Sequence, residues 1–140
     1  MTEVEALTIE SSFLRQAIEL DGGIENGAIC WKLFRTFESL GFNVAWDNEK
    51  FFSVYYGNKE HYFCSFHNSA ESTSMSMYFQ RMNDSIRDKL KEALEPIIKI
   101  PDEELDKKPR INVMLLNEQK NFKTFVDAIK TYLRNIKEQD

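Results

Sequence analysis

Residues 42–79 read FNVAWDNEKFFSVYYGNKEHYFCSFHNSAESTSMSMYF and carry the most regular pattern in the chain. Apolar and polar residues alternate in short runs, and clusters of turn-forming residues separate the runs, as in a β-meander. We predict strands at 42–47, 51–56, 61–67 and 74–79. Alternation assigns one face of this sheet to the core, namely Phe42, Val44, Trp46, Phe52, Val54, Tyr56, Tyr62, Cys64, Phe66, Met75, Met77 and Phe79.

The opposite face is more aromatic than a solvated sheet surface needs to be. Strict alternation places polar or small residues there together with four aromatic residues: Phe51, Tyr55, Phe63 and Tyr78. Four explanations stay open for this face. The first predicted helix could cover it, a second copy of the chain could pair with it, another protein could dock on it, or single-stranded nucleic acid could stack on it. Because Tyr, Phe and Met are enriched at the centres of protein interfaces, we favour the protein explanations over nucleic acid.

Helical periodicity surrounds the predicted sheet. A first helix spans the apolar residues at 13–18, and a second carries a stripe from Ile29 to Leu40 and ends at Gly41. A third helix begins at the cap cluster 83–85, kinks at Pro96 and stops at Pro101. A further strand is expected at 111–116, buried on both faces or inserted within the sheet. The last helix has an apolar stripe over 122–136, with Asn121 as its candidate cap.

These elements predict a single α+β domain over residues 1–140, with disorder left open for residues 1–10. We expect an antiparallel β-meander of about four to five strands flanked by helices, in the order α-α-β-β-β-β-α-β-α. A chain of 140 residues is long enough to bury one substantial core. Two cysteines are too few for a disulfide scaffold, so Cys30 and Cys64 are interpreted as small buried apolar residues.

The charge distribution disfavours binding to nucleic acid or to anionic membranes. The net charge is −5, and residues 1–80 carry 11 acidic and 5 basic residues, against 12 and 13 in residues 81–140. Affinity for phosphate backbones depends on clustered Lys and Arg, which such a chain lacks over most of its length. The first ten residues contain three glutamates and no Lys or Arg, unlike a signal peptide, and no apolar run approaches membrane-spanning length. We therefore expect a cytoplasmic protein.

His61, Cys64 and His67 are spaced three apart, which resembles a set of metal ligands. In a strand, however, Cys64 points away from both histidines, and the histidines stand about 20 Å apart. One zinc ion cannot reach all three at about 2.0–2.3 Å. We predict no metal site and no cofactor.

No pattern in the sequence specifies a reaction, and no catalytic residue is predicted. A nuclease of the restriction-endonuclease type holds Mg²⁺ with carboxylates on neighbouring strands, beside a lysine. The acids near the predicted turns, Asp47, Glu49 and Glu60, do not follow that spacing. A phosphate-binding loop and a serine nucleophile elbow are both absent from the sequence. Ser65 and His67 share a strand face, from which we expect no oriented proton relay.

The last predicted helix has a basic face formed by Lys123, Lys130, Arg134 and Lys137, with Lys120 just before it. We interpret this face as a solvated surface whose positive charge complements the C-terminal end of the helix dipole. A footprint for a binding partner is the alternative, and Asp127 interrupts the stripe.

The size, the acidity and the order of helices and strands resemble those of the small dimeric chaperones of bacterial secretion systems. The resemblance is one of topology, covers most of the chain and includes no diagnostic motif, and a fold resemblance of this kind does not transfer function. From the residues, we predict a non-enzymatic protein-binding module, or a small adaptor or chaperone-like protein. Its aromatic sheet face, with Phe51, Tyr55, Phe63 and Tyr78, would serve for self-association or partner docking. The alternative is a degraded or metal-dependent nuclease-like or nucleic-acid-processing subunit acting through the acids near the turns.

Overall fold

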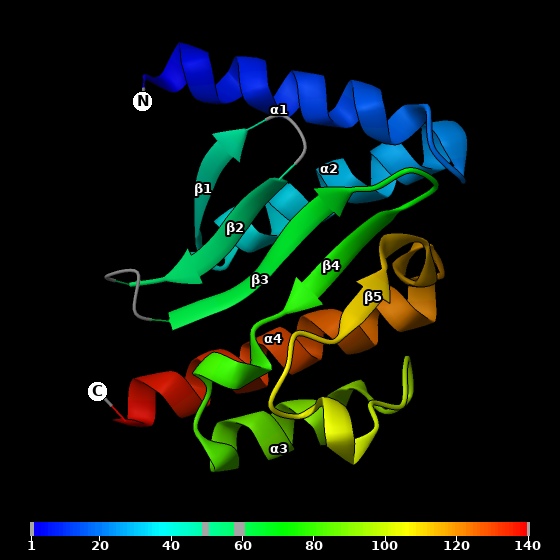
Figure 1. The fold of residues 1–140 in the computed structure, drawn as a ribbon. Helices are drawn as coiled ribbons and strands as arrows, with labels where there is room; N and C mark the ends of the chain where they lie inside the picture. Colours follow the sequence, from blue (N-terminus) through cyan, green and yellow to red (C-terminus); the bar gives the residue numbers. More distant parts are fainter. Residues whose placement is uncertain (1, 49–50, 58–60, 140) are drawn as a thin grey trace.

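The computed structural model describes residues 2–48, 51–57 and 61–139. The helices are α1 (Glu3–Ile18), α2 (Gly23–Ser39), α3 (Asp84–Leu94) and α4 (Gln119–Gln139). The strands are β1 (Asn43–Asn48), β2 (Phe51–Tyr56), β3 (His61–Asn68), β4 (Thr73–Met77) and β5 (Arg110–Asn112). Short 3-10 helices follow β4, precede β5 and follow β5, namely η1 (Phe79–Arg81), η2 (Asp102–Glu104) and η3 (Val113–Asn117). The predicted α+β class and the order of the elements are confirmed (Figure 1).

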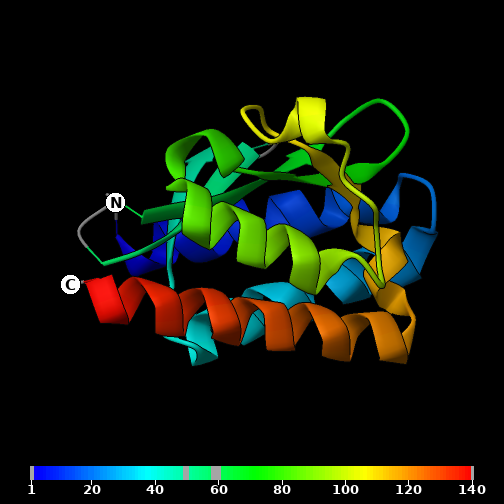
Figure 2. The same ribbon diagram turned by 90° about the horizontal axis from the view of Figure 1, so that it is seen from below.

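The five strands form one antiparallel sheet in the order β1-β2-β3-β4-β5, so the predicted meander is confirmed. Helices α2 and α4 lie behind this sheet in Figure 1 and below it in Figure 2. Helix α1 packs beside α2, and α3 packs against α4. Among the described residues, no α-helix lies over the other face of the sheet in either view. We call this surface the open face.

Phenylalanine side chains fill the space between the sheet and α2. The ring centroid of Phe34 lies 4.7 Å from that of Phe52 and 5.2 Å from that of Phe66. Phe13 of α1 joins them, 4.8 Å from Phe52. Every residue that alternation assigned to the core, except Tyr62, is buried in this cluster or packed against it. Because Phe13 lies on the core side, α1 does not cover the open face, and that explanation of the aromatic pattern is wrong.

Helix α1 includes most of the segment for which the sequence left disorder open, because it begins at Glu3. The Thr2 hydroxyl caps it by accepting a hydrogen bond from the Glu5 N–H at 3.1 Å. Glu3 and Glu5 place negative charge in the first turn, where it complements the helix dipole. The predicted end of α2 is also confirmed, since Gly41 follows it with a positive φ of 91°, a conformation that glycine adopts without steric cost.

A β-bulge in β3 changes the face of its first residues. Val54 pairs with Cys64, but the next residue of β2, Tyr55, pairs with Tyr62, so Phe63 is an extra residue without a partner in β2. Phe63 therefore points into the core, where it is fully buried. Tyr62 instead lies beside Tyr55, their ring centroids 5.5 Å apart. The predictions that placed Phe63 on the open face and Tyr62 in the core are both wrong.

The bulge also separates the two histidines. His61 pairs with Tyr56, whose ring packs against Phe42, whereas His67 pairs with Ser74 beyond the bulge. The sequence interpretation placed His61 and His67 on one face, which is wrong for the same reason as for Phe63.

Three further predictions differ in detail. Helix α3 ends at Leu94 and does not continue through Pro96, since proline has no N–H to donate to the helix and its ring clashes with the preceding turn. Strand β5 ends at Asn112, whose Oδ1 accepts a hydrogen bond from the Met114 N–H and starts η3. It pairs with β4 alone, as an edge strand. Asn121 does not cap α4, which begins at Gln119; its side chain donates to the Leu115 carbonyl instead.

Candidate protein-binding face of the sheet

Three serines form a row across the open face. The strand register pairs Ser53 with Ser65 and Ser65 with Ser76, and Ser76 pairs with Arg110 on the edge strand. The three serines are 1–5% exposed, although no α-helix of the described residues lies over them. Serine side chains are shorter than those of their larger neighbours, so the middle of the open face is recessed and polar.

A cluster of three tyrosines borders the serine row. The ring of Tyr62 lies 5.5 Å from that of Tyr55 and 5.6 Å from that of Tyr78, centroid to centroid. The Arg81 guanidinium lies 4.9 Å from the centroid of Tyr62, and the Lys108 ammonium lies 5.0 Å from that of Tyr78. These are cation–π distances. The cluster therefore presents aromatic rings together with positive charge.

Only part of this cluster is accessible to a partner. Tyr55 and Tyr62 are half-buried, whereas Tyr78 is 6% exposed. The Tyr78 hydroxyl lies 3.4 Å from the hydroxyl of Ser53, so the ring reaches across the sheet toward the serine row. Tyr78 supports the face from within, and the contact surface consists mainly of Tyr55, Tyr62 and the exposed cations beside them.

The four residues that the sequence assigned to partner binding are therefore not all brought together. Tyr55 and Tyr78 lie in the tyrosine cluster, but Phe63 is in the core and cannot contact a partner. Phe51 pairs with His67 in the sheet, but its side chain is not among the parts of the chain that the structure describes. Strict alternation missed Tyr62, since nothing in the sequence marks the bulge that turns it outward.

Ser65 and His67 form a hydrogen bond that the sequence interpretation did not foresee. The Ser65 Oγ lies 3.0 Å from the His67 Nε2. Burial lowers the pKa of His67, and the positive charges of Arg110 and Lys108 lower it further. A neutral imidazole could accept the serine proton, but Ser65 is 1% exposed and cannot reach a substrate. The pair therefore gives the face no nucleophile.

The two cysteines are free and buried, as the sequence predicted. Burial raises the pKa of the Cys30 thiol to about 12, although its hydrogen bond with Thr73 acts in the opposite direction. Burial alone raises the pKa of the Cys64 thiol well above its usual value. Since the thiolate is the reactive form, both cysteines are inert in the folded protein.

The protein-family models, the curated proteins and the solved structures contain no match to this chain. Within the described residues, no three His, Cys, Asp or Glu side chains are grouped as metal ligands. None of the described helices combines the length and the apolar character needed to cross a bilayer.

The structure does not place the acids of the nuclease alternative. Asp47 belongs to β1, but its side chain is outside the description, and Glu49 and Glu60 lie outside the described residues altogether.

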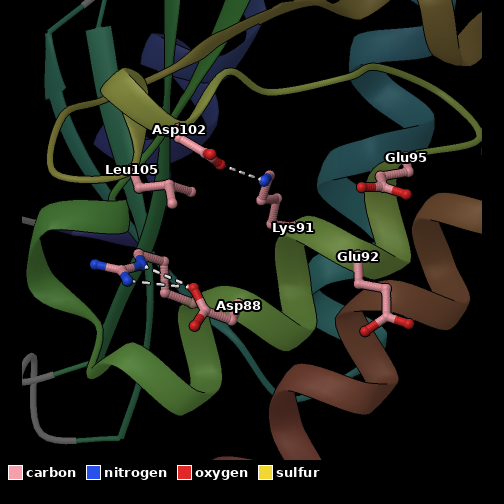
Figure 3. Close-up of a pocket in the computed structure, with 7 residues that line it drawn as sticks. Asp88, Lys91, Glu92, Glu95, Asp102 and Leu105 are labelled. Carbon is pink, nitrogen blue, oxygen red and sulfur yellow. Dashed lines mark hydrogen bonds and ion pairs between the residues drawn. The ribbon is translucent and has the colours of Figure 1, made fainter.

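A charged hollow lies between α3 and the segment around η2. Figure 3 shows Lys91 of α3 pointing toward Asp102, with Nζ 2.8 Å from the carboxylate. One turn earlier, Arg87 pairs at 3.2 Å with Asp84, Asp88 and Asp106. These pairs tie the 102–106 segment to α3. Because both cations of the hollow are already paired, we interpret it as a structural clamp and not as a ligand site.

We expect this clamp to contribute little to stability. Lys91→Ala should lower the thermal midpoint by no more than about 2 °C, because exposed ion pairs are screened by water and salt. The hydrogen bond and charge of Lys91 lower the pKa of Asp102, so the contribution is present above the usual aspartate pKa and is lost as the pH falls through the lowered one. Thermal melts of wild type, Lys91→Ala and the control Lys89→Ala from pH 2 to 7 measure this. A large drop in the thermal midpoint of Lys91→Ala at pH 7, or a drop that persists at pH 2, would contradict the interpretation of this ion pair as a weak structural clamp.

Proposed function

We propose that this protein is a non-enzymatic protein-binding module of the adaptor or chaperone type, and that its open sheet face is the docking surface. The observation that carries the proposal is the cluster of Tyr55, Tyr62 and Tyr78 with Arg81 and Lys108 above the rings. Tyr and Arg are among the residue types enriched at interface centres.

The chemistry of the face favours a protein over other ligands. Tyrosine presents a large, rigid apolar surface together with a hydroxyl, so it loses little conformational entropy on binding. Single-stranded nucleic acid would need a basic groove along the stacked rings. Here the cations already lie over the tyrosine rings, and the serine row contributes no charge. A flat polar centre beside aromatic rings is suited to binding another protein surface, which belongs either to a second copy of the chain or to a different protein.

We expect Tyr62→Ser to weaken binding by at least tenfold, because removing a central interface tyrosine typically costs more than about 1.4 kcal/mol. Light scattering across a range of concentrations measures the mass of wild type and variant. The matched control is Trp31→Ser, which removes an aromatic residue that is 53% exposed on α2, away from the open face. If wild type is a dimer, Tyr62→Ser should dissociate it and Trp31→Ser should not.

If wild type is a monomer, the proposal requires a different protein on the open face. Photo-crosslinking in the cells that express the chain then tests it, with benzoylphenylalanine at position 55 or, as the control, at position 31. A discrete protein adduct from position 55 that Tyr62→Ser abolishes would support the proposal. A wild-type monomer with no adduct beyond that of the control would overturn it.

A further inference from the structure

The seam between α2 and α4 is a second surface with binding character, on the side of the molecule away from the open face (Figure 2). Two shallow hollows of about 710 and 580 Å³ follow each other along it and share Asp127 and Lys130. Together they extend from Gln119 to Lys137 of α4, which corresponds to about 27 Å of helix. The sequence alone favoured a solvated basic face here, with a footprint for a binding partner as the alternative.

The rim of this seam is strongly basic. Six cations line the two hollows: Lys32, Lys120, Lys123, Lys130, Arg134 and Lys137. Asp127 is the one acid among the lining residues. In the part of the chain that the structure describes, none of the six cations forms an ion pair within 4 Å, in contrast to Arg87 and Lys91 of the clamp. In a chain with a net charge of −5, such an unneutralised row is the feature to explain.

The floor of the seam is apolar. Phe122, Val126 and Leu133 of α4 and Leu40 after α2 line the same hollows as the cations. The three residues of α4 share one face of the helix, at spacings of four and seven. The Lys32 ammonium lies 4.0 Å from the centroid of Phe122, so an apolar contact and a positive charge occur together.

We propose that the α2–α4 seam is a second protein-binding site, which takes an acidic helical segment of a partner protein. An amphipathic helix could lay its apolar face between α2 and α4 and direct its carboxylates to the lysines on both rims. Nucleic acid fits less well. A phosphate backbone would leave the apolar floor unused and would meet Asp127 in the middle, and Lys32 already covers the Phe122 ring on which a base could stack.

Panning of a displayed library of random 16-residue peptides against the immobilised full chain tests this proposal. We expect the enriched peptides to be acidic, with apolar residues three and four positions apart. Fluorescence anisotropy of the synthesised peptides then compares wild type with the double reversal Lys123→Glu/Lys130→Glu. Removing two rim contacts and adding two repulsive charges should weaken binding by at least 30-fold.

Two control variants make the test specific. Lys89→Glu/Lys107→Glu changes the net charge by the same amount at exposed positions outside the seam, and should weaken binding by less than threefold. Tyr62→Ser should leave the peptide affinity unchanged, which separates this site from the open face. If the double reversal fails to fold by circular dichroism, the neutral variant Lys130→Gln/Arg134→Gln replaces it, with a smaller loss expected.

Three results would overturn the proposal. The enriched peptides could lack acidic residues. The control Lys89→Glu/Lys107→Glu could weaken peptide binding as much as Lys123→Glu/Lys130→Glu does, which would indicate only long-range electrostatic attraction. A 20-nucleotide oligothymidine could bind more tightly than the peptides through the same lysines, which would assign the seam to nucleic acid.

Discussion

Phe63→Ala is expected to lower the free energy of unfolding by about 3–5 kcal/mol, and Phe63→Glu is expected to prevent folding. The Phe63 ring is fully buried, with centroids 4.7 Å from Tyr132, 5.6 Å from Phe42 and 5.8 Å from Phe37. Truncation leaves a cavity between β3, α2 and α4, and a carboxylate there would have no partner to offset its burial. Denaturant unfolding followed by circular dichroism measures both effects.

The neighbouring Tyr62 provides the matched control. Tyr62→Glu places the same charge one residue earlier, on the open face, so the variant should unfold cooperatively and close to the wild-type midpoint. Strict alternation along β3 would instead predict that Tyr62→Glu lowers the stability more than Phe63→Glu does. A folded Phe63→Glu with an unfolded Tyr62→Glu would therefore show that the bulge is absent and that Phe63 belongs to the open face.

This bulge marks a limit of what the sequence predicts. Alternation located the four meander strands, and the helical stripes located the helices, because each buries a periodic set of apolar residues. A bulge shifts the period by one residue, and it is visible only when the shift exposes an apolar residue or buries a polar one. Here Tyr62 and Phe63 are both aromatic, so either register gives a plausible sheet and the pattern cannot decide between them.

The surfaces were less predictable than the core. The basic stripe of α4 is evident in the sequence, but the seam also needs the rim cation Lys32 and the floor residue Leu40, which the position of α2 beside α4 brings to it. The tyrosine cluster likewise depends on Arg81 and Lys108, which are remote from Tyr55 in sequence and reach the face through η1 and the segment before β5. Sequence periodicity reports which side of an element is buried, and it does not report which elements meet.

The sequence pattern also did not predict a buried network of hydrogen-bonded side chains. Disrupting this network should give the second large effect on stability. The Asn26 side chain is fully buried and donates to the Ala17 carbonyl and to the Thr73 hydroxyl, both at 2.8 Å. Thr73 in turn donates to the Asn68 Oδ1 at 2.6 Å, and the Asn68 amide donates to the Phe13 carbonyl at 3.0 Å. One chain of hydrogen bonds therefore joins α1, α2, β3 and β4.

We expect Asn26→Ala to lower the free energy of unfolding by about 2–3 kcal/mol, since two buried hydrogen bonds are lost and their acceptors lose a donor. The matched control is Asn117→Ala, an exposed asparagine whose 3.3 Å bond to Glu25 is open to water, and it should change stability by less than about 0.5 kcal/mol. Urea denaturation of both variants measures the difference. Equal effects would contradict a structural role for the network.

Asn26→Asp adds a test that depends on pH. The new carboxyl would occupy the same buried space beside the Ala17 carbonyl, so burial should raise its pKa in the folded state above the value in the unfolded chain. The folded state would then bind the proton more tightly, and the stability of the variant relative to wild type should be greatest at low pH and should fall as the pH rises past the unfolded value of about 4. Unfolding free energies at pH 4 and pH 7 measure this, and a difference from wild type that does not change with pH would mean that position 26 is open to solvent.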